Sequence, residues 1–303
     1  CSSDLKTYLL FLMFFILFGI LAGALSLALS FYMTSGRGYF SLIFIGFFIL
    51  FGTLMIIFSI ISYFGSDKIV TAVSHAKLAP KEQFSKLHNI VEEMCIASGL
   101  PKPRIYVIQD TAINAFAAGR NPQHAIVCVT TGCLTRLTRD QLQGVIAHEL
   151  SHIRNFDVRT MTIAAVLVGM AVLISDMLFR MFIYGSFRGG NSKNGGIEVA
   201  IAIGVAIVAV VLTPIIAKLI TMSISRKREF VADASAIEMT RNPDGLASAL
   251  EVIGKDTEPL EAANKATAHL YIANPLKGQK LIMKSMFSTH PPIGERIRAI
   301  RGR

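Results

Sequence analysis

The sequence predicts an α+β membrane protein, with four transmembrane helices and a mostly helical domain that contains a small β-sheet. The chain of 303 residues is 52% hydrophobic and only 17% charged, whereas about a quarter of the residues of a soluble domain are charged. Long apolar runs alternate with polar segments. The first polar segment holds three short β-like runs, followed by a helix with a clear start signal.

Four apolar runs are long enough to cross a bilayer, which takes about 20 residues. These runs are 9–31, 39–64, 161–184 and 199–223. A short turn joins the first two, and a connector rich in Gly, Ser and Asn joins the last two. Two membrane hairpins are therefore predicted, at 1–64 and 160–224. The polar segments 65–159 and 225–303 lie outside the membrane.

Basic residues predict the orientation of the chain. The two polar segments hold 11 and 13 Lys or Arg residues, whereas the hairpin connectors hold only Arg37, Arg188 and Lys193. Because Lys and Arg collect on the cytoplasmic side of membranes, both polar segments are expected there. The net charge of +10 follows this membrane pattern, and no nucleic-acid-binding motif accompanies it. The predicted partner is the lipid bilayer and not a nucleic acid.

Local signals predict the elements of the polar segments. Apolar residues at helical spacing indicate a helix over 82–98, ended by Gly99 and Pro101. Thr138 and Gln141 fit a capping box, so a further helix is expected to begin near Arg139. The expected strands are 104–109, 113–118 and 125–130, and the remaining helices are 226–239, 242–253, 259–270 and 293–301.

The motif His-Glu-x-x-His stands at 148–152. On a helix, His148 and His152 lie one turn apart on the same face, about 6 Å along the axis. Two imidazoles at this spacing can bind one metal ion, usually zinc. Glu149, beside the first ligand, can take the proton of a metal-bound water. The alternative is a soluble helix with two surface histidines.

A catalytic zinc site needs a third protein ligand and an open position. A histidine at HExxHxxGxxH spacing is absent, since that position is Val158. Glu229 and Asp233 lie four residues apart on one face of a predicted helix. Glu229 is a candidate ligand, and Asp233 can hydrogen-bond a ligand histidine and fix its tautomer. The alternative is a solvated acidic face, but the second hairpin returns Glu229 to the side from which His152 leaves.

These features resemble the HtpX-type membrane zinc metalloproteases, which are related to the CAAX prenyl endopeptidases. The resemblance covers essentially the whole chain, with four spans in the expected order. The matching motifs are Asn114-Ala115-Phe116-Ala117, His148-Glu149-Leu150-Ser151-His152, Ser225 to Asp233, and Thr289-His290-Pro291-Pro292 with Arg296.

The resemblance implies a cytoplasmic, gluzincin-like zinc protease domain, with one zinc ion per subunit bound by His148, His152 and Glu229. It implies quality-control cleavage of misfolded membrane proteins or unfolded polypeptides at the inner (plasma) membrane, as in a stress response. Asn114 is expected on a substrate-binding edge strand, with a turn or packing role as the alternative. His290 is expected either to stabilise the oxyanion or to cap the following helix.

Two other functions stay open on the sequence. A prenyl-protein endopeptidase would use the same chemistry on another substrate, although such enzymes usually have more spans. A metal-binding membrane scaffold without catalysis is the second. The intact Glu149 argues against it, because a scaffold has no use for a general base there.

Overall fold

The computed structural model describes residues 40–167, 226–261, 267–273 and 291–302, together with isolated positions elsewhere. The predicted spans at 9–31 and 199–223 lie almost wholly outside these residues, as does most of the span at 161–184. In the described part of the chain, one helix is long and apolar enough to cross a membrane. This is α2 (Phe40–Val73), through its stretch Ser41–Ile61. The four-span topology stays a prediction.

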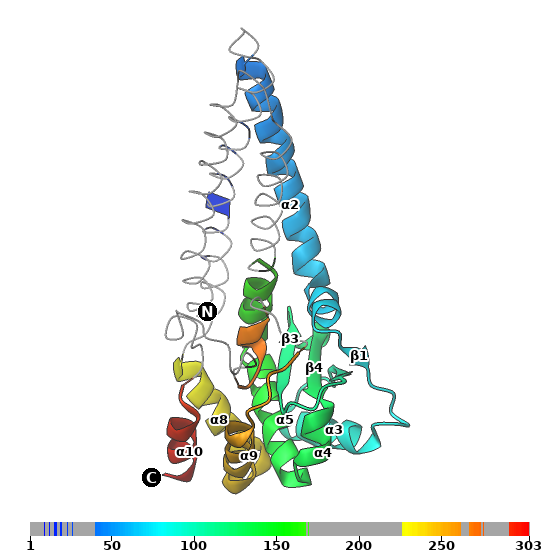
Figure 1. Cartoon of the computed structure of the whole chain (residues 1–303), viewed down its shortest axis with the longest axis vertical. Helices are drawn as coiled ribbons and strands as arrows, with labels where there is room; N and C mark the ends of the chain where they lie inside the picture. Colours follow the sequence, from blue (N-terminus) through cyan, green and yellow to red (C-terminus); the bar gives the residue numbers. More distant parts are fainter. Residues whose placement is uncertain are drawn as a thin grey trace, which may run out of the picture.

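Helix α2 joins the apolar stretch to a body of helices and strands, from which it rises in Figure 1. The predicted span ends at residue 64, but the helix continues to Val73. Its last turns belong to the body: Val70 is 1% exposed, and Asp67 pairs with Arg104 at the start of the neighbouring strand. The apolar stretch is therefore continuous with the folded body.

Four strands form one mixed sheet in the order β1-β2-β4-β3. The strands are β1 (Lys77–Leu78), β2 (Arg104–Ile108), β3 (Ala115–Gly119) and β4 (Ala125–Thr130). β2 and β4 are parallel, and the other two pairs are antiparallel. The three predicted strands are confirmed, whereas the two-residue β1 has too short a pattern to predict. Strand β3 lies at one edge of the sheet.

Strand β3 begins two residues later than predicted because side chains take the place of ladder partners at its start. The Ile113 N–H donates to a carboxylate oxygen of Asp256 at 2.9 Å, and the Asn114 N–H donates to the Thr130 hydroxyl at 3.1 Å.

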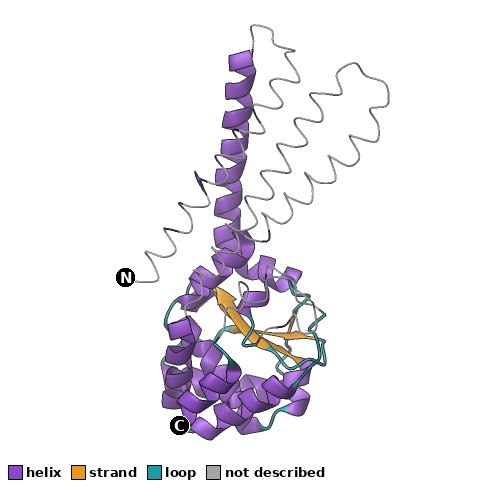
Figure 2. Ribbon diagram, turned by 60° about the vertical axis from the view of Figure 1, so that its left-hand side comes forward, coloured by secondary structure: helices purple, strands orange, loops and turns teal. Residues whose placement is uncertain are grey.

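Both faces of the sheet are covered, as Figure 2 shows for the strands among the surrounding helices. One face packs against α3 (Ser85–Ser98), α5 (Arg139–Arg154) and α9 (Pro243–Lys255), through residues such as Val127 and Ile146. The other face packs Phe116 and Ile126 against Val70 of α2 and the later residue Tyr271. Burial of this apolar surface on both sides stabilises the sheet.

The predicted helix start at Arg139 is confirmed together with its capping box. The Thr138 hydroxyl accepts from the Gln141 N–H, and the Gln141 side chain accepts from the Thr138 N–H. The remaining helical elements of the described residues are η1 (Pro122–His124), α4 (Thr131–Arg136), α8 (Arg226–Thr240), η2 (Ala268–Leu270) and α10 (Ile293–Arg301). The helix predicted over 82–98 begins at Ser85.

The helix predicted over 259–270 is wrong for its described residues. Residues 256–260 are a loop, and only η2 is helical. The backbone N–H groups of this loop bind distant partners: Leu260 donates to the Pro275 carbonyl, and Glu261 donates to the Asp110 carboxylate. These long-range bonds replace the bonds of a helix.

Helices α5 and α9 approach closely at Gly144, one turn before the His-Glu-x-x-His motif. A Cβ atom at this position would lie 2.8 Å from both the backbone nitrogen and the Cα of Leu246. Glycine therefore permits a contact that brings α9 against α5 and fixes the position of the motif.

Candidate metal centre

Helix α5 buries all three residues of the motif. His148, Glu149 and His152 are 1%, 2% and 4% exposed. Because α5 is covered by α3, α8, α9 and the sheet, the face that carries the motif has little solvent contact. The alternative of two surface histidines is therefore wrong.

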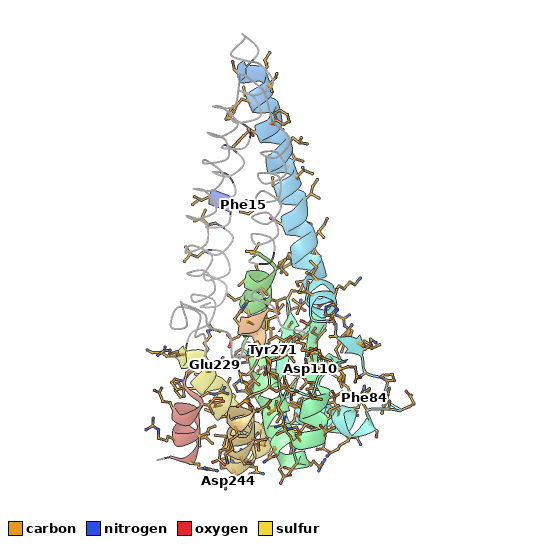
Figure 3. All side chains as sticks on the ribbon, in the orientation of Figure 1. Phe15, Phe84, Asp110, Glu229, Asp244 and Tyr271 are labelled. Carbon is orange, nitrogen blue, oxygen red and sulfur yellow. The ribbon has the colours of Figure 1, made fainter. Side chains whose placement is uncertain are left out.

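Helix α8 brings Glu229 to the two histidines. Its carboxylate oxygens lie 3.8 Å from Nε2 of His148 and 3.6 Å from Nε2 of His152, and the two Nε2 atoms are 3.3 Å apart. Potential ligand atoms of the three residues all lie within 4.8 Å of one another. Glu229 is fully buried at the beginning of α8, where Figure 3 labels it. The structure therefore brings together the three predicted ligands.

Each histidine is oriented by a carboxylate at its other ring nitrogen. His148 Nδ1 lies 2.9 Å from Asp233, and His152 Nδ1 lies 3.3 Å from Asp157. A carboxylate that accepts the Nδ1 proton leaves the Nε2 lone pair free to face a metal ion. Burial, together with the nearby charge of Arg296, lowers the pKa of His148 to about 4. The imidazole is therefore neutral, as a metal ligand must be.

Arg296 of α10 holds Asp233 in place. Its Nε and one terminal nitrogen donate to the two Asp233 oxygens at 2.9 and 2.6 Å, and the guanidinium is completely buried. Burial opposes ionisation of Asp233, but the hydrogen bonds from Arg296 and His148 outweigh it and lower the pKa to about 2. Another terminal nitrogen of Arg296 lies 3.6 Å from Glu229. One arginine therefore contacts two carboxylates of the centre.

Glu149 lies between the centre and the edge strand of the sheet. Burial raises its pKa to about 7, with the charge of His152 opposing the rise and that of Glu229 adding to it, while a backbone hydrogen bond from Ala117 of β3 favours the ionised form. A cation at the centre would lower this pKa and keep the carboxylate ionised. With a cation bound, Glu149 would have the charge of a general base, and its position makes it the candidate.

The donor set fits a divalent cation such as zinc. Two zinc–nitrogen bonds of about 2.0–2.1 Å at a tetrahedral angle would place their nitrogens roughly 3.3 Å apart, and the two histidine Nε2 atoms are separated by 3.3 Å. The four carboxylates of Glu149, Glu229, Asp233 and Asp157 face two guanidiniums, those of Arg296 and Arg228. A divalent cation would offset the excess of carboxylates over guanidiniums at this centre.

Of the other two predicted site residues, Asn114 and His290, the structure describes Asn114. Asn114 is buried at the start of β3, where its side-chain amide hydrogen-bonds the backbone of Ala273. His290 lies outside the described residues, so its two alternatives stay predictions.

Sequence reasoning assigned no role to Asp157, Arg228 or Arg296. Arg228 pairs with Asp157, and Asp157 in turn orients His152. Asp157 lies three residues after the end of α5, and the chain turns between them at Phe156, which has φ of 59°. A carboxylate five residues after the second histidine was a signal for this role. Arg296 stood in a matched motif, but no local pattern links it to Asp233.

The fold and this centre define a metallopeptidase, with a His-Glu-x-x-His helix, a glutamate from a later helix and an edge strand beside Glu149. Residues 81–303 match peptidase family M48, and the chain belongs to this family. Family membership implies a divalent metal ion in the centre. With the apolar helix α2, the chain is a membrane metalloprotease.

Relatives named protease HtpX homolog are similar over most of the chain. The relative from Dictyoglomus thermophilum is 47% identical over 241 residues, which cover 79% of this chain and 76% of the relative. That from Thermoanaerobacter pseudethanolicus is 44% identical over 251 residues, covering 82% and 81%. That from Listeria monocytogenes (strain HCC23) is 43% identical over 245 residues, covering 78% and 80%.

A solved structure has a similar fold. The crystal structure of S. mikatae Ste24p matches with a TM-score of 0.50 and 20% sequence identity, over 91% of this chain and 61% of that chain. At this identity the likeness concerns the fold alone.

Proposed function

We propose that the protein is a zinc-dependent endopeptidase of the plasma membrane that cleaves misfolded or damaged membrane proteins at the cytoplasmic face. The observation that carries this proposal is the convergence of His148, His152 and Glu229 beside the buried carboxylate of Glu149. A scaffold would gain nothing from a carboxylate held between a metal centre and the edge strand of the sheet.

The chemistry divides between the metal ion and the protein. Zinc bound by the two histidines and Glu229 would supply Lewis-acid polarisation of the peptide carbonyl and of the attacking water. Glu149 accepts the proton of that water and passes it to the leaving amine. Asp233 and Asp157 keep the imidazoles in the tautomer that faces the metal ion.

The arrangement of the chain supports a cytoplasmic active site. Segments 65–159 and 225–303 contribute to one body, since α5 of the first packs against α8 and α9 of the second. These segments carry 11 and 13 Lys or Arg residues, which the positive-inside rule places in the cytoplasm. We assign residues 1–64 and 160–224 to two membrane hairpins, and the other two segments to a divided protease domain.

The decisive experiment pairs metal content with proteolysis. Wild type, Glu149→Gln and Glu229→Ala are purified in detergent with a chelator, zinc is added, and cleavage of an unfolded protein is followed. We expect about one zinc ion in the wild type and in Glu149→Gln. Cleavage should fall by roughly 10²- to 10⁴-fold in Glu149→Gln. Glu229→Ala should retain zinc weakly.

Other results would change either the role of a residue or the function of the protein. Full cleavage by Glu149→Gln refutes its role as the base, and normal metal content in Glu229→Ala reassigns the ligand. If the wild type binds zinc but cleaves nothing, the assay is repeated in liposomes with a misfolded membrane protein. Absence of cleavage there too favours a scaffold. A prenylated CAAX peptide is the competing substrate, and preferential cleavage of it would identify a prenyl-protein endopeptidase.

A further inference from the structure

The outer edge of β3 is occupied by a segment of the chain itself. Residues 271–273, here called the strap, run antiparallel to the beginning of this strand. The Ile272 N–H donates to the Ala115 carbonyl at 2.9 Å. The Asn114 side chain brackets the next residue, since its amide nitrogen donates to the Ala273 carbonyl at 3.1 Å and its oxygen lies 3.4 Å from the Ala273 nitrogen.

The strap also reaches the metal centre through Arg296. The guanidinium that binds Asp233 and lies near Glu229 donates a further hydrogen bond to the Ile272 carbonyl at 3.3 Å. Both backbone groups of Ile272 and both of Ala273 therefore have partners on β3, on Asn114 or on Arg296. This set of contacts recognises main chain and does not depend on the strap's side chains.

The bound edge faces the catalytic glutamate. The inner edge of β3 pairs with β4, and the Asn114 carbonyl points to β4 because it accepts from the Thr130 N–H. By the alternation of an antiparallel ladder, the backbone groups of Ala115 and Ala117 point to the outer edge. Ala115 binds the strap there, and Ala117, two residues further along, binds Glu149. An extended chain paired with this edge would pass the catalytic carboxylate.

We infer that the strap fills the place of the substrate main chain and must leave the β3 edge before a polypeptide can bind for cleavage. This inference rests on the proposed function and adds a closed state to it. An incoming strand would remake the same bonds with Ala115, Asn114 and Arg296, as in recognition by strand addition. A folded protein has no free extended segment to exchange with the strap, whereas an unfolded polypeptide has one.

Packing holds the closed state. Ile272 is 2% exposed, and the ring of Tyr271, labelled in Figure 3, packs edge-on against Phe116 of β3 with centroids 5.0 Å apart. The strap and the substrate compete for one edge, so the apparent affinity for substrate falls with the fraction of protein in the closed state. Weakening the strap should increase substrate affinity without changing the metal centre.

The variant Ile272→Pro tests this expectation in the full-length protein. Proline removes the N–H that binds Ala115, and it suits the extended backbone of the preceding Tyr271, which has φ of −76° and ψ of 147°. Ile272→Val keeps the N–H and is the matched control. For an unstructured fluorogenic peptide, we expect KM of Ile272→Pro to fall by roughly 3- to 10-fold, with kcat and zinc content unchanged. An unchanged or higher KM in a folded, zinc-bound Ile272→Pro would overturn the inference.

Hydrogen exchange in the Glu149→Gln background gives a second measurement that does not depend on cleavage. Adding the same peptide should accelerate exchange at the Ile272 and Ala273 amides while Ala115–Gly119 stay slow. Slow exchange in the strap with peptide bound would refute the inference, even if Ile272→Pro fails to fold. If neither the wild type nor Glu149→Gln binds the peptide, the inference is also refuted. If the wild type binds the peptide but does not cleave it, the proposed function is refuted instead. Hydrogen exchange at the Ile272 and Ala273 amides then still tests whether the strap leaves the β3 edge.

Discussion

Replacing Arg296 with methionine removes the group that joins α10 to the metal centre. The side chain is completely buried, and its two hydrogen bonds to Asp233 are 2.6 and 2.9 Å long. Burial lowers the pKa of Arg296, but the hydrogen bond and charge of Asp233 outweigh it, so the guanidinium is charged. Methionine has a similar length and no charge, and would leave the Asp233 carboxylate buried without its cationic partner.

The structure sets the size of the expected effects. Breaking a buried ion pair by removing one partner costs about 3–5 kcal/mol, which lowers Tm by roughly 6–20 °C for a protease domain of this size. Asp233 also orients His148, and loss of such an outer partner weakens metal binding by roughly 10- to 100-fold. The loss of stability and the loss of zinc affinity should appear together, because Asp233 both pairs with Arg296 and orients His148.

The assay combines thermal unfolding in detergent with zinc titration against a competing chelator. Arg298→Met is the matched control, since Arg298 lies on the same helix but is exposed, and among the described residues its side chain donates to the Gly294 carbonyl. It should leave both quantities unchanged. Arg296→Lys keeps the positive charge, but a lysine ammonium cannot bind both Asp233 oxygens as a planar guanidinium does. Its Tm and zinc affinity should therefore lie between those of wild type and Arg296→Met. If Arg296→Met unfolds within about 3 °C of wild type and binds zinc equally well, the proposed linkage through Asp233 is wrong.

Two other substitutions test the helix contact and the second histidine. Gly144→Ala forces a Cβ to 2.8 Å from the backbone of α9 and should cost about 1–3 kcal/mol of stability. In the control Gly294→Ala, the new Cβ has no atom of the described residues within 4 Å, so Tm should not fall. Equal melting temperatures for Gly144→Ala and wild type would contradict the close approach. Asp157→Asn should weaken zinc binding by roughly 10-fold or more, measured by the same titration; unchanged affinity would show that this carboxylate does not orient the second histidine.

The helix around the His-Glu-x-x-His motif was predicted correctly because its signals are local. The capping box at Thr138 fixes the start of α5, and the four-residue spacing then places His148 and His152 on one face. These features depend on residues within one or two turns of each other, so they can be read without the fold. The edge position of Asn114 was implied by the family resemblance and not by a local rule, and the structure places Asn114 directly before the edge strand β3.

Contacts between distant segments decided the rest. Arg296 and Asp233 are 63 residues apart, Asn114 and Ala273 are 159 apart, and no sequence period connects either pair. Predicted helix 259–270 fails for the same reason, because the backbone of its first residues is satisfied by Pro275 and Asp110. A buried backbone group needs a hydrogen-bond partner but not a local one.

The sequence by itself predicted the chemistry proposed for this protein: three candidate metal ligands, a candidate base, and a helix that carries three of these four residues. Only the tertiary structure decided how that chemistry is supported and restrained, through Arg296 beneath the ligands and the strap on the β3 edge. The physical reason is range. Helix periodicity and capping act over a few residues, whereas burial of a charge or of a strand edge depends on which distant segments pack around it.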